Sequence, residues 1–146
     1  MHRKLVAAVV PALLVLVFMY TGINKLVGLT DFTASMYNQP IPHGLAYVLA
    51  RVIPVTELLT AICLVFNKTQ KLGLYLSFIL LTIFTTYIGL ILLHVFKRIP
   101  CNCAGIFRHI TWQQHLWINI LLLALTGLAL FPIIKKRFQS PLNHSI

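Results

Sequence analysis

Four long runs of apolar residues, separated by shorter polar segments, dominate the pattern of the chain. The runs cover residues 5–22, 45–66, 72–96 and 116–134. Each is close to the ~20 residues that a helix needs to cross the hydrocarbon core of a bilayer. The pattern predicts an all-α fold, a polytopic membrane protein with a bundle of four transmembrane helices, in a single domain over residues 1–146.

The first run begins after Met1-His2-Arg3-Lys4, like a signal peptide. Its apolar stretch is longer than the ~7–15 residues of such peptides and no small-x-small cleavage site follows, so we expect an uncleaved helix. Pro11 and Pro54 lie inside runs. Because neighbouring helices can satisfy the carbonyl groups that a proline frees, both residues predict kinks rather than breaks.

The connections between the runs differ in length. Residues 67–71 form a short polar segment, which predicts a tight turn and makes the second and third helices antiparallel neighbours. Residues 24–44 are a long mixed segment that contains Asp31, Pro40, Pro42 and Gly44. Residues 97–114 are also long and contain two cysteines.

Composition and charge agree with a membrane protein. Apolar residues make up 59% of the chain and charged residues 10%, whereas a soluble domain carries ~25% charge. Twelve Lys and Arg residues stand against two acidic residues, for a net charge of +10. The bases lie at the ends of apolar runs, which indicates the lipid bilayer and not nucleic acid as the partner.

The distribution of bases predicts the topology. With four spans, the side that holds both termini carries seven bases: Arg3, Lys4, Lys68, Lys71, Lys135, Lys136 and Arg137. The other side carries five: Lys25, Arg51, Lys97, Arg98 and Arg108. The positive-inside rule then puts both termini in the cytoplasm and the two long connections on the exoplasmic side, which is the periplasm in a bacterium.

Pro100-Cys101-Asn102-Cys103-Ala104-Gly105 carries the clearest candidate chemistry. Two cysteines at this spacing can approach to the distance that a disulfide tolerates. The ring that they close is small, so the bond is expected to be strained and therefore oxidising and labile. Gly105 permits the unusual backbone angles that such a closure needs.

The surroundings of Cys101 and Cys103 favour thiolate. Lys97, Arg98 and Arg108 bracket the pair and no acid lies in the segment. Cationic neighbours lower the pKa of a thiol and raise its reactive fraction. We favour an exchangeable dithiol. A permanent structural disulfide or two idle thiols are alternatives, and a Cu(I) or Zn(II) site with a histidine is disfavoured because there is only one cysteine pair.

Trp112, His115 and Asn119 lie at offsets of three and four, which places them on one face of the fourth predicted helix. Thr111 is its candidate N-cap. His115, near the membrane boundary, could pass a proton to or from a thiol as part of the catalytic set. In the alternative interpretation Trp112 anchors the helix at the interface, and the His and Asn side chains only bond helices together.

Glu57 is the only glutamate and lies near the middle of the second run. A carboxylate there should face the bundle interior and either be protonated or find a cation. Lys25, at the end of the first run, is the predicted partner, because Arg51 points elsewhere on the helix. The pair could line a polar pocket for a quinone or a proton path, but we favour a structural pair that holds two helices together.

Taken together, these segments resemble the methylamine-utilisation MauE family within the wider DoxX-like group, small four-helix bacterial membrane proteins described as redox-associated. The resemblance rests on Gly22-Ile23-Asn24-Lys25-Leu26, on Pro54-Val55-Thr56-Glu57-Leu58-Leu59, and most specifically on the cysteine block. The pattern Cys101-x-Cys103-x-Gly105 followed by Trp112-x-x-His115-x-x-x-Asn119 is similar to the Cys-Ser-Cys-Gly-Gly and Trp-x-x-His-x-x-x-Asn block of homologues. Asn102 and Ala104 depart from it.

The resemblance implies a part in disulfide formation or thiol-electron delivery for exported proteins, with a thioredoxin-like protein as partner. It does not imply methylamine metabolism. Either Cys101 or Cys103 could attack. The electrons need a second acceptor or donor; a quinone is a candidate, with Glu57 and Asn119 as weak candidates for its binding residues. Rival hypotheses are a non-catalytic assembly or chaperone subunit and a small transporter or metal-handling protein.

Overall fold

The computed structural model describes residues 2–95 and 111–139, all five of whose regular elements are helices. They are α1 (His2–Val27), α2 (Leu29–Tyr37), α3 (His43–Val65), α4 (Gln70–Leu92) and α5 (Trp112–Gln139). Four of them are long and apolar enough to cross a membrane, over Ala8–Val27, His43–Val65, Gln70–Leu92 and Trp112–Ile134. The predicted all-helical fold with four membrane-spanning helices is confirmed.

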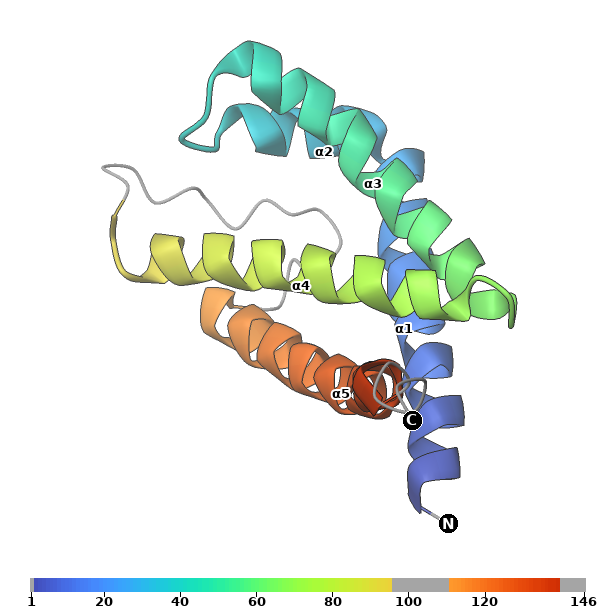
Figure 1. Ribbon diagram of the computed structural model, residues 1–146. Coiled ribbons are helices and arrows are strands. Elements are labelled where there is room, and N and C mark those ends of the chain that lie inside the picture. Colours follow the sequence, from blue (N-terminus) through green and yellow to red (C-terminus); the bar gives the residue numbers. More distant parts are fainter. Residues whose placement is uncertain (1, 96–110, 140–146) are drawn as a thin grey trace.

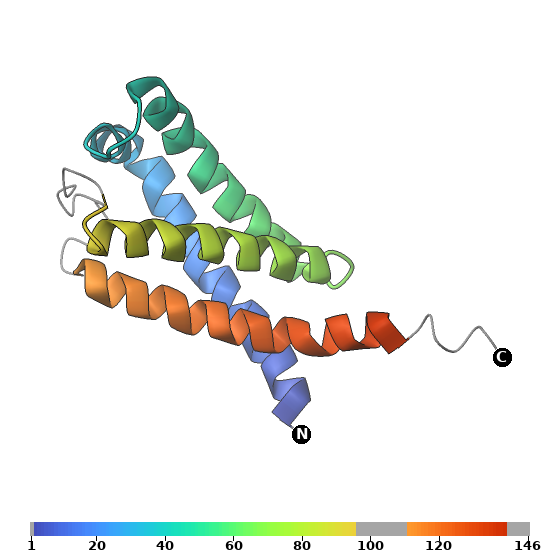
Figure 2. The same ribbon diagram turned by 60° about the vertical axis from the view of Figure 1, so that its left-hand side comes forward.

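Two helix pairs build the molecule. α1 packs mainly against α3, α5 packs mainly against α4, and the contact between α3 and α4 joins the two pairs (Figures 1 and 2). A short turn links α3 to α4, so the predicted antiparallel neighbours are confirmed (Figure 1). α1 and α3 continue through Pro11 and Pro54, which therefore do not break their helices.

The core lies where the two pairs meet. Val10, Leu14 and Phe18 succeed one another at intervals of four along α1, so they form one buried stripe. The rest of the core cluster comes from α3, α4 and α5: Ala61, Leu64, Leu74, Leu81, Leu122, Ala129 and Leu130. Large apolar side chains also cover the outside of the spans, for example Leu16 and Trp117. On membrane-spanning helices this exposed apolar surface faces lipid.

Buried hydroxyl groups in α4 and α5 satisfy themselves within their own helices. Ser77 and Thr126 have no exposed surface. Each donates to the carbonyl four residues earlier, that of Gly73 and that of Leu122, at 2.7 Å. A hydroxyl in an apolar interior must be bonded, and this local bond lets small polar residues sit between packed helices.

The connection over residues 24–44 is not a simple loop. α1 runs on to Val27, and the short helix α2 occupies residues 29–37 of the connection and packs against α3 (Figure 1). Asp31 lies in the first turn of α2, where a negative charge favours the helix N-terminus. With nine residues, α2 is far shorter than a membrane span.

α4 ends at Leu92, four residues before the end of the apolar run that predicted it. His94 adopts a left-handed backbone with φ of 55°. The amide of Val95 donates to the carbonyl of Leu90, and that of His94 to Ile91. These two bonds form a Schellman motif, which closes the helix and satisfies its last carbonyl groups.

Gly73 allows α4 to approach α3 at their turn. A Cβ atom there would lie 2.8 Å from the backbone nitrogen of Leu64. We expect Gly73→Ala to push the helices apart and to lower the free energy of unfolding by about 1–3 kcal/mol. A lower thermal midpoint in detergent checks this.

Gly89→Ala is the matched control, because it lies on the same helix and a Cβ there meets nothing within 4 Å. Alanine favours a helix over glycine, so this variant should be as stable as the parent or more stable. Equal midpoints for Gly73→Ala and Gly89→Ala would contradict the close approach.

Candidate functional site

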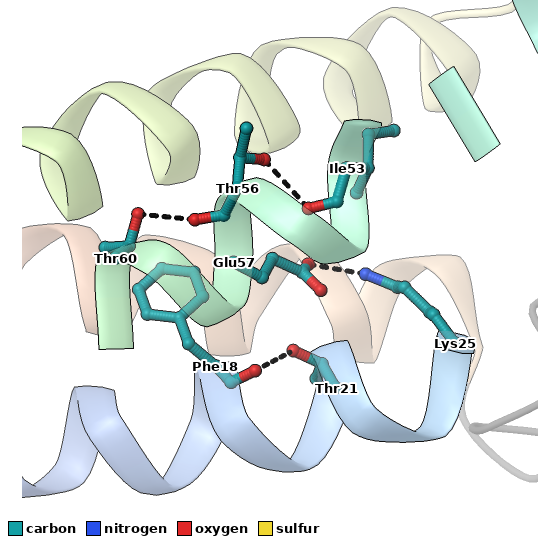
Figure 3. A network of polar contacts seen from close by, with 7 residues as sticks. All are labelled: Phe18, Thr21, Lys25, Ile53, Thr56, Glu57 and Thr60. Atoms are coloured by element: carbon teal, nitrogen blue, oxygen red, sulfur yellow. Dashed lines mark hydrogen bonds and ion pairs between the residues drawn. The ribbon is translucent and has the colours of Figure 1, made fainter. Parts of the chain in front are cut away.

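A buried ion pair joins α1 to α3. Lys25 Nζ donates to Glu57 Oε1 at 2.5 Å (Figure 3). The Glu57 side chain is 2% exposed and that of Lys25 16%. The structure therefore contains the predicted pair, and Glu57 faces the bundle interior as expected. A carboxylate at this depth needs such a partner because an isolated charge is costly in an apolar medium.

α1 and α3 can bring Lys25 and Glu57 together because the two helix backbones lie close to each other next to the ion pair. Gly22 lies one turn before Lys25, and a Cβ on it would be 2.9 Å from the Leu58 side chain and 3.2 Å from the Pro54 carbonyl oxygen. A larger residue would therefore force α1 away from α3. The two segments that carry the family resemblance are thus one structural unit, a close helix contact with an ion pair next to it.

Hydroxyl groups around the pair donate hydrogen bonds to backbone carbonyl groups of their own helices. Thr21 donates to the carbonyl of Phe18 at 3.4 Å, and Thr56 to that of Ile53 at 2.8 Å (Figure 3). Thr60 donates to the carbonyl of Thr56 at 2.7 Å. These local bonds satisfy the three hydroxyl groups without a partner from another helix.

The Lys25 ammonium lies at a junction of four helices, α1, α2, α3 and α4. Its nitrogen is 5.6 Å from the ring centroid of Phe32 on α2 and 5.6 Å from that of Phe84 on α4. His115 on α5 lies within its electrostatic range. Aromatic faces attract a cation, so Lys25 is held by Glu57 and two rings at once. Sequence reasoning missed Phe32, which lies in the long mixed connection, and Phe84, which looks like an ordinary core residue in an apolar run.

Two buried polar atoms have no hydrogen-bond partner among the described residues. They are Glu57 Oε2 and Asn119 Nδ2, one an acceptor and the other a donor. Asn119 is 5% exposed. Leaving such groups unpaired costs about 1–3 kcal/mol each, so both retain capacity to bond a water molecule or a ligand.

The start of α5 is capped as the sequence predicts. The amide of Gln114 donates to Thr111 Oγ1 at 3.3 Å, and the Thr111 amide donates to Gln114 Oε1 at 2.9 Å. This reciprocal pair is a capping box. It fixes the first turn of α5, on which Trp112 and His115 are both partly buried.

A second polar contact ties the segment after α2 to α4. The Tyr87 hydroxyl donates to Gln39 Oε1 at 2.5 Å. Tyr87 lies one turn after Phe84, so α4 contributes both an aromatic wall at Lys25 and this bond. Gln39 stands before a proline in a segment without a recognisable motif, so no sequence signal pointed to this contact.

Cys101, Cys103 and Gly105 lie outside the described residues. The described ends of the connection that contains them are Val95 and Thr111. Cys63, on α3, is a free, partly buried thiol. Within residues 2–95 and 111–139, no three His, Cys, Asp or Glu side chains are grouped as a metal site.

Comparison with protein-family models supports the family resemblance that the sequence suggested. The family model described as methylamine utilisation protein MauE matches residues 3–132. The chain belongs to the MauE family. The match includes both halves of the ion pair and the cysteine segment, while membership of the wider DoxX-like group stays a prediction. Neither a curated protein nor a solved structure matches this MauE-family chain.

Removing one partner of the ion pair should cost more than removing both. Lys25→Leu or Glu57→Leu leaves a buried charge alone and is expected to lower the free energy of unfolding by about 3–5 kcal/mol. The double variant removes both charges and should recover most of that loss. Thermal midpoints of the four proteins in detergent form the double-mutant cycle, and additive losses would contradict the pair.

Proposed function

We infer that this MauE-family membrane protein is a thiol–disulfide exchange component of a bacterial inner membrane. Cys101 and Cys103 form the exchanging pair, and a thioredoxin-like protein, soluble or membrane-anchored, is the partner. The exchange supports disulfide formation or maturation of exported proteins. It does not require methylamine as a substrate.

The observation that carries this proposal is where the described ends of the connection that contains the pair lie. α4 ends and α5 begins at the same end of the bundle (Figure 2). His115 lies in the first turn of α5, and its amide donates to the carbonyl of Thr111, the first described residue after the cysteine segment. A titratable imidazole therefore lies one helix turn after that segment, which suits thiolate chemistry.

The proposed exchange balances within the two proteins. A thiolate of the pair attacks one sulfur of the partner's disulfide, forming a mixed disulfide and releasing the partner's other sulfur as a thiolate. The second cysteine then attacks the mixed disulfide, and the partner leaves with two thiols. One disulfide is reduced and one dithiol is oxidised, and the reverse sequence of steps oxidises the partner.

His115 acts on protons in this scheme and forms no bond to sulfur. As a base it accepts the proton of the attacking thiol, and as an acid it returns one to the leaving thiolate.

The proposed topology places both termini in the cytoplasm and the cysteine segment in the periplasm. Its support is the excess of seven bases over five on the side of the termini. A periplasm also suits an exchangeable disulfide, because cytosolic thiols are kept reduced.

Serine at either cysteine should abolish exchange without loss of the bundle, because neither cysteine lies in a predicted span. Cys101→Ser and Cys103→Ser are expected to trap mixed disulfides with a thioredoxin-like protein, seen as reductant-sensitive bands. His115→Ala should slow exchange by roughly 10²-fold, while His43→Ala, an exposed histidine, is the control. Full complementation of a deletion strain by both serine variants would favour the assembly-subunit hypothesis instead.

The topology predicts which reporter fusions are active. A reporter placed after Arg137 should be active only if it is one that works in the cytoplasm. A periplasm-type reporter that is active at this site would invert the orientation and put the cysteine pair in a reducing compartment.

A further inference from the structure

We propose that Arg51 binds the phosphate of an anionic phospholipid in a shallow cavity between α2 and α3. The cavity has a volume of about 320 Å³. Its lining residues are Leu29, Thr30, Thr33, Ala34, Tyr37 and Arg51. Arg51 is the only charged residue among them, and most of the remaining wall is apolar. This site is separate from the Lys25 junction and does not depend on thiol exchange.

The charge of Arg51 has no counterpart on its own chain. Asp31 and Glu57 are the only acidic side chains in the sequence. Glu57 is committed to Lys25, and Asp31 is exposed and does not line the cavity. Within the described parts of the chain, Arg51 makes no ion pair. A compensating anion must therefore come from outside.

The guanidinium group is held in position but keeps most of its donors. Arg51 lies 3.6 Å over the ring of Tyr47, and its Nη1 donates to the Tyr47 carbonyl at 3.2 Å. That bond uses one of five N–H donors. Stacking orients the plane of the group, and the remaining donors suit the two oxygens of a phosphate.

Arg51 lies in the first half of α3, and its guanidinium turns back toward the start of the helix, where Nη1 bonds the Tyr47 carbonyl. It lies eight residues after His43, the first residue of α3, which is about 12 Å along the axis. The side chains of Tyr37 and Tyr47 are exposed beside it, and tyrosine is typical of the membrane interface. An arginine inside a span extends its side chain toward headgroup phosphates rather than leaving its charge in the hydrocarbon.

The surface next to Arg51 offers a path for an acyl chain. Val55 and Ile62 come four and eleven residues after Arg51, on the same face of α3, and both are exposed. This apolar stripe leads from the charge toward the other end of the span. A free phosphate would use only the guanidinium, whereas a lipid uses the charge, the cavity and the stripe, so we assign the site to lipid.

Native mass spectrometry of the full chain in detergent tests the assignment. Phosphatidylglycerol should be retained in preference to phosphatidylcholine with the same acyl chains. Arg51→Gln should weaken phosphatidylglycerol binding roughly fivefold, and Arg51→Lys should restore part of it. Lys68→Gln, which removes an exposed base from the turn between α3 and α4, should leave binding unchanged.

Further measurements distinguish a specific lipid site from nonspecific attraction of anionic lipid to the basic chain. Ala34→Trp would fill the cavity while leaving Arg51 in place, and it should also weaken phosphatidylglycerol binding. This variant tests the site even if Arg51→Gln does not fold. Equal losses for Arg51→Gln and Lys68→Gln would overturn the site. Displacement of the lipid by inorganic phosphate at equal concentration would overturn the assignment to a lipid.

Discussion

A single carboxylate in the apolar interior constrains how this bundle is put together. Glu57 is fully enclosed, and a lone charge there would be prohibitive, so a cation must reach it. Lys25 does so only because Gly22 lets α1 lie against α3 without a side chain between the backbones. The ion pair and the close helix contact therefore depend on each other.

The rest of the molecule is arranged around this contact. α1 ends at Val27, soon after Lys25, and α2 begins at Leu29 and places Phe32 near the ammonium. α4 contributes Phe84 to the same charge, and α5 brings His115 into its range. Lys25 is thus the point at which side chains of α1, α2, α3 and α4 meet, although most of the packing lies elsewhere, in the α1–α3 and α4–α5 pairs.

Much of this arrangement could be predicted from the sequence, for physical reasons that can be named. The ion pair is predictable because one run contains a single acid and another ends in a lysine, and buried charges must pair. The cap at Thr111 is predictable from its hydroxyl and from Gln114 three residues on. The cysteine pair was the most specific motif in the sequence, but its segment lies outside the described residues, so its chemistry rests on sequence and on the flanking helices.

Other features left no such signal. α2 is too short to show a full apolar repeat, and its neighbouring prolines suggested a loop. α4 ends at Leu92, and His94 just after it adopts a left-handed conformation that usually indicates glycine, so the apolar run gave no sign of the helix end. Phe32 and Phe84 contact Lys25, but an aromatic residue near a cation cannot be told from a core aromatic until the helices are placed.

Because the chain has so few acidic residues, most of its basic side chains have no acidic partner within the chain. Twelve bases share two carboxylates, and the buried one already belongs to Lys25. Most of the remaining bases must then be neutralised by anions from outside the chain. At Arg51 the geometry suits lipid phosphate. Around Cys101 and Cys103 the sequence puts Lys97, Arg98 and Arg108 but no acid, and in the proposed function this positive charge would stabilise a thiolate. One compositional bias thus favours both anchoring in anionic lipid and reactive sulfur.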